Sequence, residues 1–208
     1  IVNFFIGFSA GLSVLVSHLY GEKQYDRLSA LVQSIFVTVL AFAVLFTAVG
    51  ILLTEHLLTA LSTPAELIPQ ASLYLRIALG GILAQLLYNT ASAILRALGN
   101  TTSALHYLAA AVVLNIVFDV LLLFVIPCGI AGAAMATVAA QYVSALLALH
   151  KLLYLRGAWQ LRPHRPFFQP AHLLPILGTS IPAGLQAVFM SISSLVIQTY
   201  INSFGYAA

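Results

Sequence analysis

Residues 102–154 read TSALHYLAAAVVLNIVFDVLLLFVIPCGIAGAAMATVAAQYVSALLALHKLLY, and this stretch decides the fold. Two apolar runs, each long enough to cross a bilayer as a helix, are separated by Pro127, Cys128 and Gly129. Asp119 lies inside the first run, and a lone acid in an apolar helix is costly in a membrane. Because such an acid usually faces a bundle interior or a water-filled cavity, the stretch predicts a polar site between two helices.

The composition of the whole chain indicates the same class of protein. Of the 208 residues, 62% are hydrophobic and only 6% are charged, and the mean hydropathy is +1.04. Soluble domains carry about 25% charged residues, so the composition excludes a soluble globular protein. A dispersed net charge of +3 does not indicate a nucleic-acid partner. The sequence therefore predicts an all-α, polytopic transmembrane bundle whose surroundings are the lipid bilayer.

Six transmembrane spans are predicted from the apolar runs, at about 1–20, 28–53, 67–98, 102–126, 131–154 and 172–204. Residues 63–66 (TPAE) have the pattern of a capping box with proline at the first helical position, which predicts a helix start there. Residues 99–100 (GN) end the third span, and Thr101 or Thr102 is expected to cap the next helix. The chain begins and ends inside apolar sequence, so we expect it to be a piece of a longer protein.

The distribution of Lys and Arg predicts which loops face the cytoplasm. Seven of the eight basic residues lie in or beside alternate loops, at positions 23, 27, 96, 151, 156, 162 and 165. The loops at 54–66 and 127–130 carry none. By the positive-inside pattern, loops 21–27, 99–101 and 155–171 are cytoplasmic, in a multi-pass protein of the cell inner (plasma) membrane. Arg76 is the exception, because it lies near the outer surface. The 155–171 connection, which holds three of the eight prolines, predicts a boundary between two bundles.

Three polar side chains of the quoted stretch are predicted to lie together. Asp119 precedes the turn at residue 128 by nine residues and Thr137 follows it by nine, so at about 1.5 Å per residue both lie about 13 Å below the outer surface. Asn115 is one turn before Asp119 and shares its helix face. An acid, an amide and a hydroxyl can hold a proton or coordinate a small hard cation such as Na⁺. The alternative is an interhelical hydrogen-bond clamp that carries no ion.

The third span carries a second polar feature. Gln85, Asn89 and Ser92 follow one another at i, i+4 and i+7 and form one stripe, and Tyr74 precedes them on the same span. Such a stripe lines a cavity or packs against another polar helix, and we favour the cavity.

The sequence contains one pattern that resembles a catalytic motif, and its context argues against catalysis. Residues 7–11 (GFSAG) match the G-x-S-x-G nucleophile pattern, but they lie in a predicted membrane helix and not at a strand-to-helix turn. Close packing of small residues is the better interpretation. None of the six histidines pair at metal-ligand spacing. The sequence therefore predicts neither an enzyme nor a metal centre of the usual kind.

Several motifs resemble those of the multidrug and toxic compound extrusion (MATE) transporters. The strongest match joins LNIVFD at 114–119 to GIAGAAMAT at 129–137. The others are VSHLYG at 16–21, YLRI at 74–77, ILRALGN at 94–100 and SIP at 180–182. Together these motifs cover essentially the whole sequence.

The resemblance implies a fold of twelve helices in two six-helix lobes related by pseudo-two-fold symmetry, of which this chain holds helices two to seven. Residues 1–155 would be the N-terminal lobe without its first helix, 156–171 the cytoplasmic linker, and 172–208 the first helix of the C-terminal lobe. The family exports small, amphipathic, mostly cationic compounds in exchange for Na⁺ or H⁺ by alternating access. We therefore expect an antiporter that needs no cofactor beyond its coupling ion and that acts as a monomer when full length.

The resemblance also assigns roles to individual residues. Asp119, Asn115 and Thr137 match positions that bind the coupling cation or proton in the N-terminal lobe of prokaryotic members, and Tyr74 and Asn89 match further positions of that network. The family's key acid in helix one lies outside this chain. In the last span, Gln198 and Asn202 are neutral, which places coupling in the first lobe alone.

Two other functions remain open at this point. A flippase for lipid-linked oligosaccharides has a related architecture, but its cavity should carry several cationic side chains for pyrophosphate, and only Arg76 lies within a span. A non-transporting membrane subunit would keep Asp119 buried and inert. Neither the substrate nor the choice between Na⁺ and H⁺ follows from the sequence.

Overall fold

Seven α-helices account for most of the residues that the computed structural model describes, which are 2–60, 63–64, 66–125, 129–154 and 167–203. The helices are α1 (Val2–Gly21), α2 (Tyr25–Ala60), α3 (Ile68–Gly80), α4 (Ile82–Ala97), α5 (Thr101–Val120), α6 (Gly129–Leu153) and α7 (Leu173–Ser203). A π-helical turn, η1 (Leu121–Val125), continues α5, and a 3₁₀ turn, η2 (Pro170–His172), precedes α7. Most of the predicted linker, residues 155–166, lies outside the described part of the chain.

Six segments of this part of the chain are long and apolar enough to cross a membrane. They are Val2–Gly21, Tyr25–Ala60, Ile68–Ala97, Thr101–Leu123, Gly129–Leu153 and Pro170–Asn202, so the six predicted spans are confirmed. The second is longer than predicted, because no glycine or proline follows Gly50 to end the helix before Ala60. The third span consists of α3 and α4 with a break between them at Gly81.

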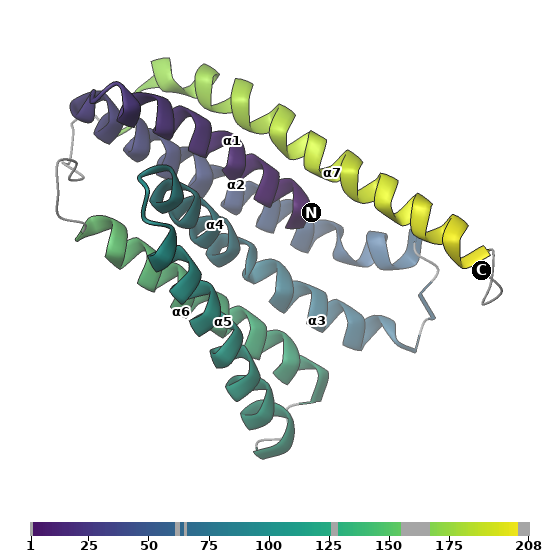
Figure 1. The fold of residues 1–208 in the computed structure, drawn as a ribbon. Coiled ribbons are helices and arrows are strands. Elements are labelled where there is room, and N and C mark those ends of the chain that lie inside the picture. The colour runs from purple at the N-terminus through teal and green to yellow at the C-terminus, as the bar shows by residue number, and fades with distance from the viewer. Residues whose placement is uncertain (1, 61–62, 65, 126–128, 155–166, 204–208) are drawn as a thin grey trace.

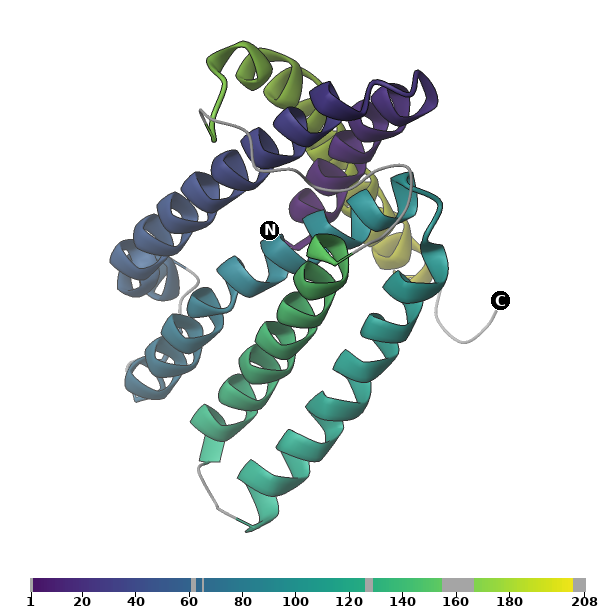
Figure 2. The same ribbon diagram turned by 90° about the vertical axis from the view of Figure 1, so that its left-hand side faces the viewer.

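The helices form a layered bundle (Figure 1). α3 and α4 lie between α1, α2 and α7 on one side and the α5–α6 pair on the other, as the turned view confirms (Figure 2). The core is made by apolar side chains at helical spacing on α1, which pack against buried side chains of α2 and α4: Phe5, Phe8, Leu12, Val16, Leu28, Ile35, Leu86 and Leu95. In lipid this packing works through van der Waals contact, since apolar side chains gain little by leaving an apolar solvent.

α1 and α7 approach each other closely where α1 has no side chain. A Cβ atom placed on Gly11 would lie 2.6 Å from the carbonyl oxygen of Thr179, and one placed on Gly7 would overlap the Ala183 carbonyl. Both obstacles are backbone atoms of α7, which a small rotamer change cannot move. The packing interpretation of residues 7–11 is therefore confirmed, and these glycines let two backbones meet as in other membrane helix pairs.

The start of α3 corrects one prediction. The helix does not begin at the capping-box pattern of residues 63–66 but at Ile68, with Leu67 as its N-cap and no side-chain cap bond. Pro69 gives the physical reason. At the second helical position its missing N–H costs nothing, whereas in a helix that began at Pro64 it would lie in the interior and break a hydrogen bond.

The cap of α5 also differs from the prediction. The Asn100 side-chain oxygen accepts the Ser103 backbone N–H at 3.3 Å, so Asn100 is the N-cap in place of Thr101 or Thr102. Gly99, with φ of +82°, turns the chain out of α4 immediately before it. This left-handed turn leaves only one non-helical residue before α5, and that residue is Asn100.

One hydroxyl holds the segment before α7 to α2. Ser34 Oγ is buried and donates to the Ala30 carbonyl of its own helix at 3.0 Å. It accepts the Gln169 backbone N–H at 3.2 Å, and His172 Nδ1 lies 3.1 Å away. The Ser34 hydroxyl thus contacts both the Gln169 backbone and the His172 ring of the returning chain. A single serine thus fixes where the chain returns to the bundle.

Candidate functional site

Of the three polar residues predicted to lie together, Asn115 on α5 contacts Thr137 on α6. Asn115 Nδ2 donates to Thr137 Oγ1 at 3.3 Å, and Thr137 Oγ1 donates to the Ala133 carbonyl one turn earlier at 3.1 Å. The Thr137 hydroxyl is therefore saturated as a donor and oriented by its own helix. Among the residues that the structure describes, the side-chain oxygen of Asn115 has no hydrogen-bond partner and is available to a ligand.

Asp119 lies one turn beyond Asn115, toward the C-terminal end of α5, and is half-buried. Among the residues that the structure describes, its carboxylate has no hydrogen-bond or ion-pair partner. The depth estimate from the sequence put Asp119 level with Thr137, whereas in the structure Asn115 contacts Thr137. The π-helical turn at 121–125 contributes to this offset, because a wider turn advances less along the axis per residue than the α-helix that the estimate assumed.

A cavity of about 260 Å³ brings together polar side chains from α3, α4 and α6. Tyr74, Gln85 and Thr137 line it, together with Gln141. The rest of its wall is apolar: Val2, Leu75, Ala78, Leu79, Ile82, Ala134 and Val138. No charged side chain is among these lining residues, so the cavity offers hydroxyls and amides in an apolar shell, which is typical of a site for small organic molecules.

Gln141 is the residue that sequence reasoning missed. It follows Thr137 at i+4, and Ser144 follows at i+7, so α6 carries a polar stripe with the same spacing as the predicted stripe on α4. The signal was present in the sequence as this i, i+4, i+7 spacing within the fifth apolar run. Both packing and cavity lining occur on α6, because Ala136 and Ala140 are buried while Gln141 reaches the cavity.

The α4 stripe leads from this cavity into the bundle. Gln85 lines the cavity, Asn89 lies one turn deeper, and Ser92 is fully buried. Neither the Asn89 Nδ2 nor the Ser92 Oγ has a hydrogen-bond partner among the described residues. Of the three residues predicted to line a cavity, Tyr74 and Gln85 lie on the wall of this one and Asn89 is not among its lining residues, so a role for them stays a prediction.

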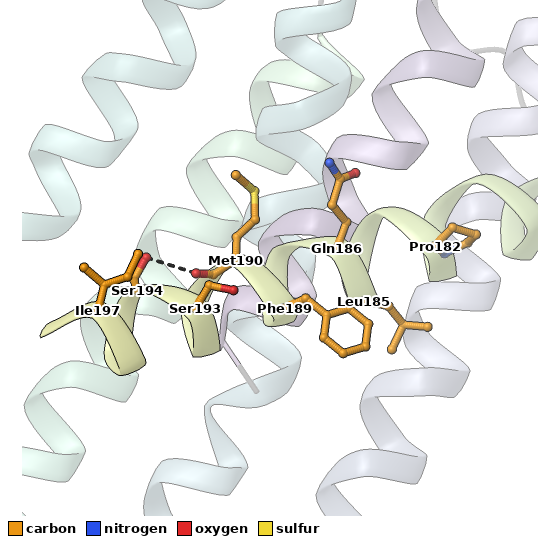
Figure 3. Close-up of a pocket in the computed structure, with 8 residues that line it drawn as sticks. All are labelled: Pro182, Leu185, Gln186, Phe189, Met190, Ser193, Ser194 and Ile197. Carbon is orange, nitrogen blue, oxygen red and sulfur yellow. Dashed lines mark hydrogen bonds between the residues drawn. The ribbon is translucent and has the colours of Figure 1, made fainter. Parts of the chain in front are cut away.

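A second hollow lies on the outer face of α7. Figure 3 shows its lining side chains along one helix: Pro182, Leu185, Gln186, Phe189, Met190, Ser193, Ser194 and Ile197. The volume is about 620 Å³, but every lining residue belongs to α7, so this is a helix surface. Further along α7, Gln198 Nε2 donates to Asn202 Oδ1 at 3.0 Å. These two side chains are neutral, and α7 carries no acid beside them.

Arg76, the exception to the charge pattern, has a partner. Its Nη2 lies 2.7 Å from Glu55 Oε1, in an exposed ion pair between α3 and α2. The positive charge near the outer end is therefore balanced locally, and it does not point into the cavity that Tyr74 and Gln85 line.

The comparison with known proteins identifies the family. A family model described as MatE matches residues 1–121, which is more than half of the chain. The chain belongs to the MatE family. It is 33% identical over 205 residues to the probable multidrug resistance protein YpnP of Bacillus subtilis (strain 168), and 27% identical over 219 residues to the probable multidrug resistance protein YoeA of the same organism. Each match covers 99% of this chain and 46% of the relative, so the chain spans about half the length of these MatE proteins.

Solved structures agree on the fold. The outward-facing conformation of a multidrug resistance MATE family transporter of the MOP superfamily superposes with a TM-score of 0.84 at 23% identity, over 93% of this chain and 43% of the other. The inward-facing conformation gives 0.83 at 23% identity, over 92% and 44%. Family membership and the six spans show that this is a multi-pass membrane protein of a transporter family, and not an enzyme.

Proposed function

We propose that the full-length protein is a cation-coupled antiporter that exports small, amphipathic, mostly cationic compounds by alternating access. One observation carries this proposal: Thr137 belongs both to a polar cluster suited to an ion and to a cavity suited to an organic compound. Thr137 accepts the Asn115 amide on one side and lines the cavity with Tyr74 on the other. Asp119 lies one turn from Asn115 on the same helix, so a change in charge there is close enough to alter the cavity wall.

The coupling step follows from what each group can hold. Asp119 takes up a proton, or the carboxylate joins the Asn115 side-chain oxygen and the Thr137 oxygen as ligands of Na⁺, which prefers oxygen donors. Binding Na⁺ would draw Asn115 and Thr137 toward the ion and away from their mutual hydrogen bond. Because Thr137 also lines the cavity, the ion and the compound would each favour a different orientation of its side chain. Each would then lower the affinity for the other by the same factor.

The cavity is suited to the apolar part of an exported compound. Its polar groups are neutral, so recognition there rests on hydrogen bonds from Gln85 and Gln141 and on ring contact with Tyr74. The cationic part of a substrate would be attracted by Asp119 nearby. Protonation or Na⁺ binding at Asp119 removes that attraction, which gives a physical reason for exchange of ion against compound.

The arrangement of the whole protein is part of the proposal. Residues 1–155 form the N-terminal lobe, 156–171 the cytoplasmic linker and 172–208 the first helix of the C-terminal lobe, in the cell inner membrane and as a monomer. The positive-inside pattern supports this orientation, which puts the α5–α6 turn and the Arg76–Glu55 pair outside. The absence of an acid from α7, where Gln198 donates to Asn202, supports coupling in the N-terminal lobe alone.

The test is transport by the full-length protein in lipid vesicles, with ethidium and tetraphenylphosphonium as probes. One set of vesicles carries a Na⁺ gradient at equal pH, and the other carries a pH gradient without Na⁺. Wild type is expected to move the probes under one of the two gradients, which identifies the coupling ion. Asp119→Asn is expected to abolish this movement, since it keeps the shape of the side chain but cannot take a charge.

Asp26→Asn is the matched control, because Asp26 is an exposed aspartate at the start of α2, distant in sequence and helix from the site. It is expected to transport as wild type. Unchanged transport in Asp119→Asn would refute the role of Asp119. Failure of the wild type to move either probe under both gradients would refute the antiporter and leave a non-transporting subunit. A flippase is not favoured, since the cavity lining has no cationic side chain to hold pyrophosphate.

A further inference from the structure

The third span is interrupted at a pair of glycines. α3 ends at Gly80, α4 begins at Ile82, and Gly81 lies between them with its N–H 3.0 Å from the Ala78 carbonyl. This bond is one residue shorter than the α-helical spacing and tightens the turn. An interruption inside a membrane frees backbone carbonyls that water cannot reach, so neighbouring helices must supply donors.

Two side-chain hydroxyls from different helices supply these donors. Thr47 Oγ1 of α2 donates to the Leu79 carbonyl at 3.2 Å, and Tyr142 OH of α6 donates to the Gly80 carbonyl at 3.1 Å. The two acceptors are consecutive residues at the end of α3. The break is therefore held by one hydroxyl from α2 and one from α6.

The same two helices also enclose the break sterically. A Cβ on Gly81 would lie 2.8 Å from Val138 Cγ2 and 2.9 Å from Gln141 Oε1 of α6. On the opposite side, a Cβ on Gly50 of α2 would lie 2.8 Å from the Leu79 side chain. α2 and α6 thus fit tightly around the break, and movement of α3 against α4 must displace one of them.

The angle at this break determines the shape of the cavity. α3 contributes Tyr74, Leu75, Ala78 and Leu79 to the wall, and α4 contributes Ile82 and Gln85. The two sets lie on opposite sides of Gly81, so a change in the angle moves Tyr74 relative to Gln85. Neither Thr47 nor Tyr142 is itself among the lining residues.

We propose that Thr47 and Tyr142 are positioning residues, which fix the angle between α3 and α4 and thereby determine which compounds the cavity accepts. Their effect is indirect, because both act on backbone carbonyls and not on a ligand. The selection of compounds rests on the proposed function, whereas the effect on the angle does not.

The angle is tested without any ligand. Spin labels are attached to cysteines at Leu73→Cys on α3 and Arg96→Cys on α4, both exposed positions, in full-length protein with Cys128→Ser. Pulsed electron paramagnetic resonance then measures the distance distribution between the labels. Tyr142→Phe and Thr47→Val are each expected to broaden or shift it, and Thr47→Ser, which keeps the hydroxyl, is expected to restore it.

Matched controls remove a hydroxyl that does not reach the break. Tyr154→Phe removes one from an exposed ring at the end of α6, which contacts His150, and Thr59→Val removes one that bonds only to the Glu55 carbonyl of its own helix. Both are expected to leave the label distances as in wild type. Unchanged distances in Tyr142→Phe and Thr47→Val, in variants that melt at the wild-type temperature, would overturn the positioning role.

Ligand selection is tested with two cations of different shape, tetraphenylphosphonium and rhodamine 6G, bound to the purified full-length protein. Tyr142→Phe and Thr47→Val are expected to change the ratio of the two Kd values by about fivefold, as loss of one hydrogen bond allows. A ratio unchanged within twofold, together with altered label distances, would refute the link to selection. Wild type that binds neither probe would count against the proposed function, while the label distances would still decide the positioning role.

Discussion

Asn115 Nδ2 lies 3.3 Å from Thr137 Oγ1, and this bond joins α5 to α6. Among the described residues of α5, Ala104 alone is buried, and the other side chains are partly or fully exposed. In a helix that buries so little of its surface, a polar bond to its neighbour has correspondingly greater weight. Hydrogen bonds between membrane helices contribute about 0.6 kcal/mol on average and up to about 1.7 kcal/mol.

The Asn115–Thr137 bond can be measured by a double-mutant cycle. Asn115→Leu and Thr137→Val each remove one partner, and the coupling between them is expected to be about 1 kcal/mol in the free energy of unfolding in detergent micelles. The same cycle with Thr137→Val and Asn3→Leu serves as control, because Asn3 bonds to Ser191 on α7 and not to α6. A coupling energy indistinguishable from zero in the first cycle would mean that the Asn115–Thr137 bond does not stabilise the fold.

The close contact of α1 with α7 predicts strong sensitivity to one methyl group. Gly11→Ala places a Cβ against the Thr179 carbonyl, and overpacking against backbone is expected to cost about 1–3 kcal/mol. Gly178→Ala is the control, since a Cβ there meets open space and an alanine favours the helix. Thermal unfolding of the full-length protein, followed by circular dichroism, measures both. Equal melting temperatures for the two variants would contradict the contact.

The contacts of Ser34 with Gln169 and His172, just before α7, predict that two variants differ in stability. Ser34→Ala removes the acceptor of the Gln169 amide and the Ser34 contact of the His172 ring. His172→Ala leaves the Gln169 bond in place and removes the ring's contacts with Ser34 and with the Ala30 carbonyl. We expect Ser34→Ala to lower the free energy of unfolding by about 1–3 kcal/mol and His172→Ala to lower it less. Ser17→Ala, which removes an exposed hydroxyl bonded within α1, is the control. A larger loss of unfolding free energy in His172→Ala than in Ser34→Ala would show that Ser34 is not the main contact.

The Glu55–Arg76 ion pair is expected to contribute little to stability despite its 2.7 Å separation. Both side chains are exposed, and exposed pairs contribute about 0–1 kcal/mol and weaken with salt. Arg76→Gln should therefore lower the melting temperature slightly at low ionic strength and not at all in about 1 M NaCl, where the screening length falls to about 3 Å. A loss that persists at high salt would indicate that Arg76 has a packing role.

The spans were predictable from sequence because the bilayer reduces the problem to length and hydropathy. No such rule gives the rotation of each helix about its axis. The Asn115–Thr137 contact was within reach, since both residues flank a single turn. The bonds of Thr47 and Tyr142 to the break were not, because they join residues on helices that are distant in the chain and depend on rotations set by packing.

Local errors had local causes. The capping-box pattern at 63–66 is a sound signal in isolation, but Pro69 determined the start of α3. The sequence predicts an unbroken third span because Gly80 and Gly81 are both compatible with an apolar run. The interruption is marked by the short Gly81–Ala78 bond and by the hydroxyls that bond to the Leu79 and Gly80 carbonyls. Gln141 lies on a stripe of α6 that the sequence analysis did not single out.

The glycine contact between α1 and α7 has a consequence for biosynthesis. Gly11 and Thr179 are separated by more than 160 residues, and translation at about 5–20 residues per second takes about 8–34 s over that length. During this interval Gly7 and Gly11 lack the α7 backbone that they contact in the finished bundle. Their contact is therefore one of the last that the growing chain can complete.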